Sequence, residues 1–508
     1  MNPEATERLG LHPADDANQR LADAVHPADW PRPEPAALYD LVVVGAGTAG
    51  LVVAAGAAGL GARVALVERH LMGGDCLNAG CVPSKSLLAA AHAAHAVRRA
   101  SILGIRTGPV AVDFAAVMRR LRETRAALAS HDSAARFRSL GVDVFLGNAR
   151  FVRTGETEVD GVVLRWRKAV IATGARAALP DVPGLAAARP LTHETVFNLT
   201  ELPRRLAVIG AGPIGCELAQ AFRRLGSEVT LVASGPRPLP RDEPAAGDIV
   251  ANRLGADGVH LIANARLSRV ESPRPGLYRL HVGGPSGIRT FEAEHILVAA
   301  GRRPNVDALG LDAVGVQTDP RRGVLVDDHL RTTNRRIFAA GDVCLRHQFT
   351  HAADFSARIV IQNALFFGRK RASGLNIPWC TYTDPEVAQV GLTEAAAAAR
   401  GIKTTLFARE FADVDRARTA AETDGFVRIL VRAGTDRILG ATIVGARAGE
   451  MISEISVAMA AGMGLGRLAA VIHPYPTMAE AIRQCGDAYN RTRLTPRAKW
   501  FLGRLLRL

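Results

Sequence analysis

Two cysteines that stand five positions apart, Cys76 and Cys81, lie in the segment GGDCLNAGCVPSK at residues 73–85. A bridge between them would close a loop too short to restrict the unfolded chain much, so it would add little stability. A close pair of this kind points to redox chemistry or to a metal, and the spacing allows an exchangeable disulfide. Pro83 and the helical sequence after it put Cys81 near a helix N-terminus, where the thiolate is favoured.

A metal site is the alternative for paired cysteines. Zinc would need two more ligands at suitable spacing, and the sequence has no second Cys/His pair of that kind. We therefore predict no metal site. The other four cysteines are predicted to be small buried apolar residues: Cys216, Cys344, Cys380 and Cys485.

A glycine-rich turn precedes the cysteine pair. The pattern Gly45-x-Gly47-x-x-Gly50 follows an apolar run at 41–44, which predicts a strand buried on both faces, and it opens a helix of small residues. The free N–H groups at such a helix N-terminus favour the pyrophosphate of a dinucleotide. Glu68, at the end of the next predicted strand, is placed to accept a hydrogen bond from a ribose hydroxyl.

A second turn of the same type, Gly210-x-Gly212-x-x-Gly215, lies between a predicted strand at 205–210 and a helix. The same physical reasons apply to its three glycines, because the turn must be tight and the backbone must approach the phosphates. The sequence therefore predicts two dinucleotide folds in one chain.

The residues after this second unit bear on which nicotinamide nucleotide binds. No carboxylate stands at Ala233 or Ser234, where an acid would bind the 2′-hydroxyl of NAD and repel the 2′-phosphate of NADP. Arg237 and Arg241 follow closely and could serve that phosphate, although they could also be solvated loop residues. The pattern favours NADP(H) over NAD(H).

The composition is that of a soluble globular protein, with 48% hydrophobic and 22% charged side chains among 508 residues. No run of ~18 apolar residues argues for a spanning helix, and the polar N-terminal sequence lacks a secretory pattern, so we expect a cytoplasmic protein. The net charge of +14 arises from 63 basic residues, of which only five are lysine. This indicates an arginine-rich background and no nucleic-acid partner.

At the cysteine pair the chain resembles a known family. The segment at 73–85 resembles the redox-disulfide motif of the FAD-dependent pyridine nucleotide–disulfide oxidoreductases, which include dihydrolipoyl dehydrogenase, glutathione reductase and mercuric reductase. Residues 171–175, 299–305 and 337–343 resemble further family motifs in the family's order, and the resemblance covers roughly residues 39–495.

The resemblance implies an α/β fold with two Rossmann-type dinucleotide-binding domains, for FAD and for NAD(P), and a C-terminal α+β dimerisation domain. It also implies a homodimer whose active sites are shared between the subunits. The expected boundaries are 1–37 for a flexible N-terminal extension, 38–185 for the first part of the FAD domain, 186–305 for the NAD(P) domain, 306–376 for the second part of the FAD domain, 377–495 for the dimerisation domain and 496–508 for a basic tail.

The tail is distinctive in charge. From Arg491 onward it carries six basic and no acidic side chains among leucine, tryptophan and phenylalanine. We expect it to cover the dimer or to remain solvated, since most charge runs do; the alternative is an amphipathic segment on a membrane surface.

The resemblance also implies a role for each residue of the redox segment. Cys81 would face the flavin and form a charge-transfer thiolate, while Cys76 would be the interchange thiol that meets the acceptor. Lys85 would lie near flavin N5, and Glu217 would pair with it, because a buried ammonium needs a counter-charge. The cofactor-binding residues that we expect are Gly45, Gly47, Gly50, Glu68, Lys85, Ala149, Thr173, Gly174, Asp342, Thr350, Gly210, Gly212, Gly215, Ser234, Arg237 and Gly301.

One departure from the family pattern bears on the acceptor. Disulfide-reducing members supply a histidine base from the other subunit, in a His-Pro-Thr segment followed by a glutamate. Here the base position holds Tyr475, with Glu480 at the expected spacing, and His473 stands two residues too early. Tyrosine, with an ordinary pKa near ~10, is a poor base at neutral pH.

A tyrosine at this position resembles mercuric reductase, whose soft metal is passed between thiolates. The chain lacks that enzyme's amino-terminal Cys-x-x-Cys domain and its vicinal cysteine pair near the C-terminus. Our leading hypothesis is therefore a mercuric reductase-like enzyme that reduces a soft-metal or thiol-reactive acceptor. The alternatives are a dihydrolipoyl dehydrogenase-type disulfide reductase and, in another class, a low-turnover flavin redox sensor or interaction protein.

Overall fold

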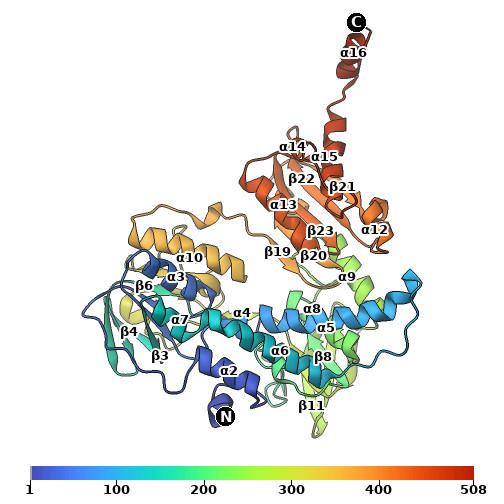
Figure 1. Cartoon of the computed structure of the whole chain (residues 1–508). Coiled ribbons are helices and arrows are strands. Elements are labelled where there is room, and N and C mark those ends of the chain that lie inside the picture. The colour runs from blue at the N-terminus through green and yellow to red at the C-terminus, as the bar shows by residue number, and fades with distance from the viewer. Residues whose placement is uncertain (1–2, 286, 508) are drawn as a thin grey trace.

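In the computed structural model, which describes residues 3–285 and 287–507, the first unit is built on a seven-stranded sheet (Figure 1). Its central strand, β1 (Tyr39–Val44), is buried along almost its whole length, as expected for a strand covered on both faces. The other strands and helices of this unit are β2 (Val64–Glu68), β3 (Val142–Leu146), β4 (Ala149–Arg153), β5 (Glu156–Val159), β6 (Val162–Ile171), β18 (Ile337–Ala339), α3 (Thr48–Gly59), α4 (Gly74–Asn78), α5 (Cys81–Arg99), α6 (Phe114–Leu128), α7 (Ala134–Ser139) and α10 (Thr350–Leu365). The strand order is β3-β2-β1-β6-β5-β4, and β18 pairs with β6 in parallel although it comes much later in the chain.

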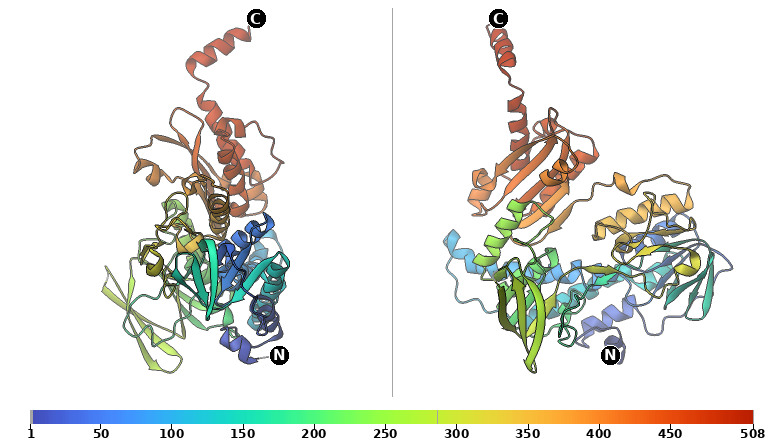
Figure 2. Two further views of the ribbon diagram at one scale, coloured as in Figure 1. Left: turned by 90° about the vertical axis from the view of Figure 1, so that its left-hand side faces the viewer. Right: turned by 180° about the vertical axis from the view of Figure 1, so that it is seen from behind.

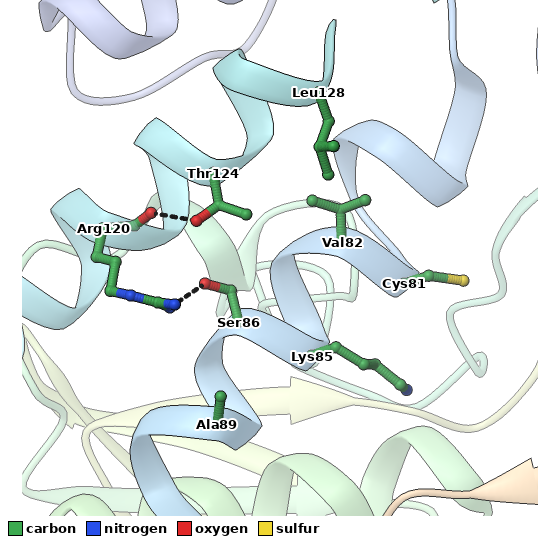
Figure 3. Close-up of a pocket in the computed structure, with 8 residues that line it drawn as sticks. All are labelled: Cys81, Val82, Lys85, Ser86, Ala89, Arg120, Thr124 and Leu128. Atoms are coloured by element: carbon green, nitrogen blue, oxygen red, sulfur yellow. Dashed lines mark hydrogen bonds between the residues drawn. The ribbon is translucent and has the colours of Figure 1, made fainter. Parts of the chain in front are cut away.

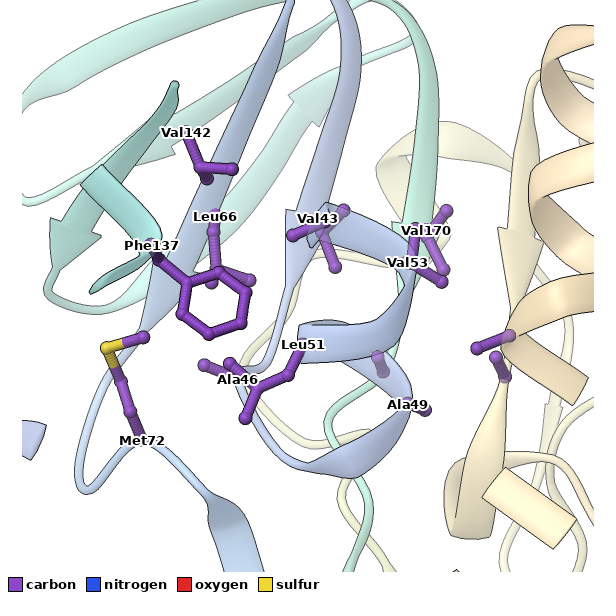
Figure 4. Close-up of a cluster of buried hydrophobic side chains, with 14 of the residues drawn as sticks. Val43, Ala46, Ala49, Leu51, Val53, Leu66, Met72, Phe137, Val142 and Val170 are labelled. Atoms are coloured by element: carbon purple, nitrogen blue, oxygen red, sulfur yellow. The ribbon is translucent and has the colours of Figure 1, made fainter. Parts of the chain in front are cut away.

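Small residues bring two helices of this unit close together. A Cβ atom at Gly56 of α3 would lie only 2.6 Å from Cδ1 of Ile361 in α10, so the glycine allows their close approach. Figure 4 shows Val43, Leu66 and Val53 in the core between the sheet and α3. This packing holds α3, whose N-terminus lies at the first glycine turn, against the sheet and α10.

The second unit repeats the strand–helix pattern. Its elements are β8 (Arg205–Ile209), β9 (Glu228–Val232), β10 (His260–Ile262), β11 (Arg266–Arg274), β12 (Leu277–Gly284), β13 (Gly287–Ala293), β14 (His295–Val298), α8 (Pro213–Leu225) and α9 (Pro244–Ala256). A parallel sheet has the order β10-β9-β8-β14, a separate antiparallel sheet has the order β11-β12-β13, and α8 packs against α5 of the first unit.

The chain crosses between these two units twice. The crossings lie side by side because β7 (Ala175–Ala177) and β15 (Arg302–Pro304) pair in antiparallel fashion. After the second crossing, two short strands, β16 (Thr318–Asp319) and β17 (Gly323–Val324), precede the return to the first sheet.

The third unit is an antiparallel five-stranded sheet with helices packed on it, in the strand order β19-β20-β23-β22-β21. Its elements are β19 (Trp379–Thr381), β20 (Glu386–Gly391), β21 (Thr404–Glu410), β22 (Phe426–Arg432), β23 (Ile438–Gly445), α11 (Glu394–Ala398), α12 (Asp415–Thr419), α13 (Ala448–Ala460), α14 (Leu465–Leu468) and α15 (Glu480–Thr492). The last helix, α16 (Pro496–Leu505), extends away from this unit (Figure 1).

These units confirm the predicted fold class of two Rossmann-type domains followed by an α+β domain. Figure 2 shows the two chain ends at opposite extremes of the molecule. Across the described ranges, no helix combines the length and the apolar character that crossing a membrane requires.

The prediction of a flexible extension at residues 1–37 is wrong for much of its length. α1 (Pro3–Arg8) and α2 (Asp16–Val25) form there, and Leu21 and Val25 are completely buried in the core of the first unit. The segment looked unstructured because alanine, proline and charge dominate it, and its few apolar side chains gain a partner only from the folded domain.

Candidate active site

The two cysteines lie on consecutive helices that meet at a glycine. Cys76 is on α4, Cys81 is the first residue of α5, and the backbone turns between them at Gly80. A Cβ atom at Gly80 would lie 2.8 Å from the carbonyl oxygen of Asp75, so only glycine fits this turn without a shift. Both cysteines are free thiols, and their sulfur atoms are hydrogen-bonded to each other.

The pKa values of Cys76 and Cys81 are shifted in opposite directions. The hydrogen bond from Cys76 is the main cause that lowers the pKa of Cys81 to about 6, against the effect of burial. Thr350 Oγ1, which lies 3.3 Å from Cys81 Sγ, and the positive charge of Lys85 act in the same direction. The pKa of Cys76 is raised by that same hydrogen bond and by burial. At neutral pH the pair therefore holds one proton, on Cys76, and one negative charge, on Cys81.

An ion pair joins α5 to the second unit next to the thiols. Lys85 Nζ donates to Glu217 Oε2 at 2.8 Å, so the predicted contact is present. Glu217 is 5% exposed, and its Oε1 accepts from the backbone N–H of Tyr382 at 2.8 Å. The ammonium also lies 4.4 Å from the centre of the Tyr382 ring. One residue from each of the three units therefore meets close to Cys81.

Tyr382 is a residue of this site that the sequence did not indicate. It lies in the loop between β19 and β20, and no motif or spacing connects it with the cysteines. Burial raises its pKa to about 12, so the phenol stays protonated at neutral pH. Only the packing of the third unit on α8 reveals that the ring covers the lysine.

A pocket of about 370 Å³ opens between α5 and α6 beside the thiolate (Figure 3). Cys81 and Lys85 of α5 line it together with Arg120 and Thr124 of α6. Arg120 donates to Ser86 Oγ at 3.1 Å, which holds the two helices at this separation. Its lining is mainly aliphatic with two cationic side chains, Lys85 and Arg120, which suits a small organic molecule.

Hydrogen bonds through α6 connect the N-terminal helix α2 to the redox segment. Arg125 of α6 donates to the backbone carbonyl of Asn78 at 2.8 Å and to Oδ1 of the fully buried Asn18 in α2 at 2.5 Å. The backbone N–H of Met72 donates to the carbonyl of Val25 at 3.2 Å. The segment that carries Cys76 is therefore tied to residues that lie before the first nucleotide fold.

The first glycine turn lies directly on the redox segment. A Cβ atom at Gly50 would lie 1.7 Å from the carbonyl oxygen of Gly45, and one at Gly74 would lie 2.6 Å from Cα of Gly47. Gly47 precedes α3, and no side chain caps that helix, so its first N–H groups are free for an anion. Glu68 holds the turn, because its Oε2 accepts from a backbone N–H there at 2.7 Å.

The second glycine turn has the same form. Gly212 precedes α8 without a side-chain cap, and a Cβ atom at Gly215 would lie 1.8 Å from a carbonyl oxygen of the turn. Ser234 is exposed just beyond β9. Arg237 Nε donates to Asp248 of α9 at 2.8 Å, so this arginine already has an acidic partner.

A partly buried charged cluster links the redox segment with the second crossing. Arg302 pairs with Asp75 and lies 3.4 Å from Asp342, and His193 lies 3.5 Å from Asp75. Burial raises the pKa of Asp342, whereas hydrogen bonds from His193 and Arg302 lower the pKa of Asp75 in spite of its burial. Nε of Arg302 is buried and has no hydrogen-bond partner within the described residues. Such a donor indicates a site that a bound group completes.

The remaining predicted cofactor residues lie at the strand ends and crossings. Thr173 Oγ1 donates to the carbonyl of Asn305 at 2.6 Å, and the N–H of Asn305 donates to the carbonyl of Gly174 at 2.9 Å. Gly301 lies in the same crossing with a φ of +137°, and Ala149 begins β4. The two crossings are therefore held together by hydrogen bonds just beyond the C-terminal end of β6.

Tyr475 and Glu480 form their contacts inside the third unit. Tyr475 is 69% exposed, and its hydroxyl donates to Asp415 Oδ2 at 2.8 Å, which raises its pKa. Glu480 begins α15. His473 Nε2 lies 2.9 Å from Glu454 Oε1, so it too is engaged in this unit. A role at the cysteines would have to be played across a dimer interface.

Comparison with known proteins decides the family. The family model described as pyridine nucleotide-disulphide oxidoreductase matches residues 39–357, and the model of its dimerisation domain matches residues 377–485. The chain belongs to the pyridine nucleotide-disulphide oxidoreductase family. It is a flavin-dependent oxidoreductase with a redox-active cysteine pair, and the dimerisation domain supports a homodimer.

Relatives of this oxidoreductase carry two different names at similar identity. A mercuric reductase of Lysinibacillus sphaericus is 36% identical over 89% of this chain and 83% of its own length. A dihydrolipoyl dehydrogenase of Bacillus subtilis is 34% identical over 88% of this chain and 96% of its own length. Among solved structures, the HOCl-induced flavoprotein disulfide reductase RclA from Escherichia coli superposes with a TM-score of 0.78 at 29% identity, covering 88% of this chain and 99% of that one.

The residues present fit FAD. The uncapped start of α3, the glycines that let a backbone approach, and the orphaned donor of Arg302 are features that an elongated anionic dinucleotide would complete. Gly47 and Glu68 would hold its pyrophosphate and ribose, and Asp342 and Lys85 would face its other end. When bound, FAD supplies the two-electron relay between a nicotinamide and the cysteine pair.

We expect the Cys81 thiolate to disappear as the pH falls through about 6, because its pKa is lowered to that value. In the two-electron-reduced holoenzyme, a thiolate beside flavin gives a long-wavelength charge-transfer band, whose absorbance should fall by half near that pH. Lys85→Met should move the midpoint to higher pH and Glu217→Gln to lower pH, because Lys85 lowers and Glu217 raises the pKa of Cys81. Midpoints that coincide in all three proteins would refute this electrostatic assignment.

Proposed function

We propose that this enzyme transfers electrons from NADPH, by way of FAD and the Cys76–Cys81 pair, to a soft metal ion or another thiol-reactive acceptor. The observation that carries the proposal is Tyr475 at the position of the family's histidine base. Its hydrogen bond to Asp415 raises the pKa of the phenol further, so it cannot serve as a base at neutral pH. An acceptor that binds thiolates directly needs no such base.

The charge distribution on the pair suits this chemistry. Cys81 carries the thiolate and Cys76 holds the proton, and the loss of that proton provides a second thiolate when a soft cation binds. Two electrons then pass to the metal, which goes from Hg(II) to Hg(0) if mercury is the acceptor. The two sulfur atoms form a disulfide, and the proton of Cys76 goes to water.

Features of the relatives support a metal acceptor. Mercuric reductases are among them, and RclA has also been solved as a Cu(II) complex, at 29% identity and a TM-score of 0.78, over 87% of this chain and 98% of that one. A dihydrolipoyl dehydrogenase-type reaction is the second candidate, favoured by Glu480 at the spacing typical of disulfide-reducing members and by relatives of that name.

The finer assignments belong to the same proposal. NADPH is favoured over NADH because Ser234 stands where an acid would select NAD, although Arg237 is engaged by Asp248. Tyr475 and Glu480 would reach the cysteines of the other subunit in a homodimer. We also place the enzyme in the cytoplasm, where a close cysteine pair serves redox chemistry and not structural stability.

An acceptor screen tests the proposed function. Steady-state NADPH oxidation by the holoenzyme is measured with Hg(II), Cu(II), lipoamide, glutathione disulfide and a quinone, with NADH as the alternative donor. We expect a metal ion to be the fastest acceptor and Cys76→Ser to abolish that rate. A quinone or glutathione disulfide that is reduced fastest, with Cys76→Ser as active as the wild type, would exclude the proposal.

A further inference from the structure

α16 stands apart from the rest of the molecule. None of its residues is buried, and in the three views of Figures 1 and 2 it projects beyond the third unit. Its large apolar side chains are left in water: Trp500 is 66% exposed, Phe501 57%, Leu502 45% and Leu505 49%. Exposed large apolar side chains on one short helix indicate a surface for a partner.

The helix is specified by its own sequence. Thr495 precedes it and its side chain accepts from the backbone N–H of Ala498 at 3.2 Å, and Pro496 occupies the first turn. These features start a helix without help from the folded body. The start of α16 is therefore set by its own sequence, and none of its residues is buried against the third unit.

The side chains of α16 are sorted by face. Ala498, Phe501, Leu502 and Leu505 stand at helical spacings of three and four, which puts them on one side. The opposite side carries basic residues and Trp500, whose ring lies 5.6 Å from the guanidinium of Arg504. The basic residues of this face are Arg497, Lys499 and Arg504.

The positive charge of the C-terminal segment favours an anionic partner. No acidic residue follows Asp487, and Arg491 and Arg493 add to the positive charge just before α16. An anionic partner would neutralise these basic side chains, whereas a second copy of this chain, with its net charge of +14, would not. An anionic lipid surface offers both an apolar layer and negative headgroups at the depth that such a helix reaches.

We propose that α16 is a membrane-surface helix that binds bilayers containing anionic phospholipid. It lies in the plane of the interface, with Phe501, Leu502 and Leu505 toward the acyl chains and the arginines among the headgroups. The enzyme is thereby held at a membrane without spanning it. The proposal does not depend on which acceptor the cysteine pair reduces.

Vesicle binding of the full-length holoenzyme tests this. Co-sedimentation is measured with vesicles of phosphatidylcholine alone and of equal parts phosphatidylcholine and phosphatidylglycerol. The bound fraction should be at least about tenfold higher with phosphatidylglycerol and should fall as salt is added. A chain that ends at Thr495 and the double variant Phe501→Glu, Leu505→Glu should both lose binding and keep wild-type turnover in solution.

A control variant places a glutamate at an exposed apolar residue outside α16. Ile288→Glu, at a position 73% exposed on β13, should bind vesicles like the wild type. Equal sedimentation of the truncated and full-length chains with anionic vesicles would overturn the proposal. A truncated chain that becomes monomeric by light scattering would overturn it too, because α16 would then serve the second subunit.

Discussion

Replacing Cys76 or Cys81 by serine should lower acceptor turnover by at least about 1000-fold, the scale of loss seen when a reacting group is removed. Neither variant can form the disulfide, so electrons have no route out of the site. The two variants should differ in their absorption spectra. Cys76→Ser keeps the Cys81 thiolate, because a serine hydroxyl can donate the same hydrogen bond, and it should show the charge-transfer band without added reductant. Cys81→Ser should lack the band at every pH.

Cys485→Ala is the matched control for these variants. Cys485 is completely buried in the core of the third unit, and burial raises its pKa to about 12, so it takes no part in thiolate chemistry. Its replacement should leave turnover per bound flavin unchanged. Metal reduction that persists in Cys76→Ser would mean that the acceptor takes electrons without the interchange thiol.

Tyr475→His should raise the turnover of lipoamide by about 100-fold, within the range that a positioned general base supplies. The imidazole would stand where Glu480 can orient it, and it titrates near neutral pH, which the phenol beside Asp415 does not. Metal reduction should change much less, since the thiolates bind the ion directly. The measurement is kcat/KM for lipoamide and for Hg(II) on both proteins.

Tyr475→Phe serves as the control for that substitution. It removes the hydroxyl and its hydrogen bond to Asp415 without providing a base, so lipoamide turnover should stay at the low wild-type value. Rapid lipoamide turnover by the wild type, or no increase of that turnover in Tyr475→His, would show that the lack of a histidine base does not limit the reaction.

Much of the site could be predicted because local sequence determines it. The glycine turns must hold uncapped helix ends, and Cys76 and Cys81 are close for any backbone that turns at Gly80. The Lys85–Glu217 pair was predictable for another reason: a lysine close to the flavin needs an acid, and the resemblance supplied its position.

The rest depends on contacts that sequence patterns do not carry. Tyr382 reaches Lys85 only because the third unit packs on α8. Asp415 meets Tyr475 across 60 positions of sequence. α2 is a helix because the folded domain gives Leu21 a core to enter, and Asn18 a buried arginine to bind. Such long-range partners are the main reason why the N-terminal prediction was wrong.

Parallel kinetics with NADPH measure the acceptor preference of the cysteine pair. kcat/KM is measured for Hg(II) and for lipoamide on the same wild-type holoenzyme, with Hg(0) release followed alongside NADPH oxidation. We expect kcat/KM for Hg(II) to be at least about 100-fold above that for lipoamide, with one NADPH oxidised for each Hg(0) released. A lipoamide value that equals or exceeds the Hg(II) value would contradict it.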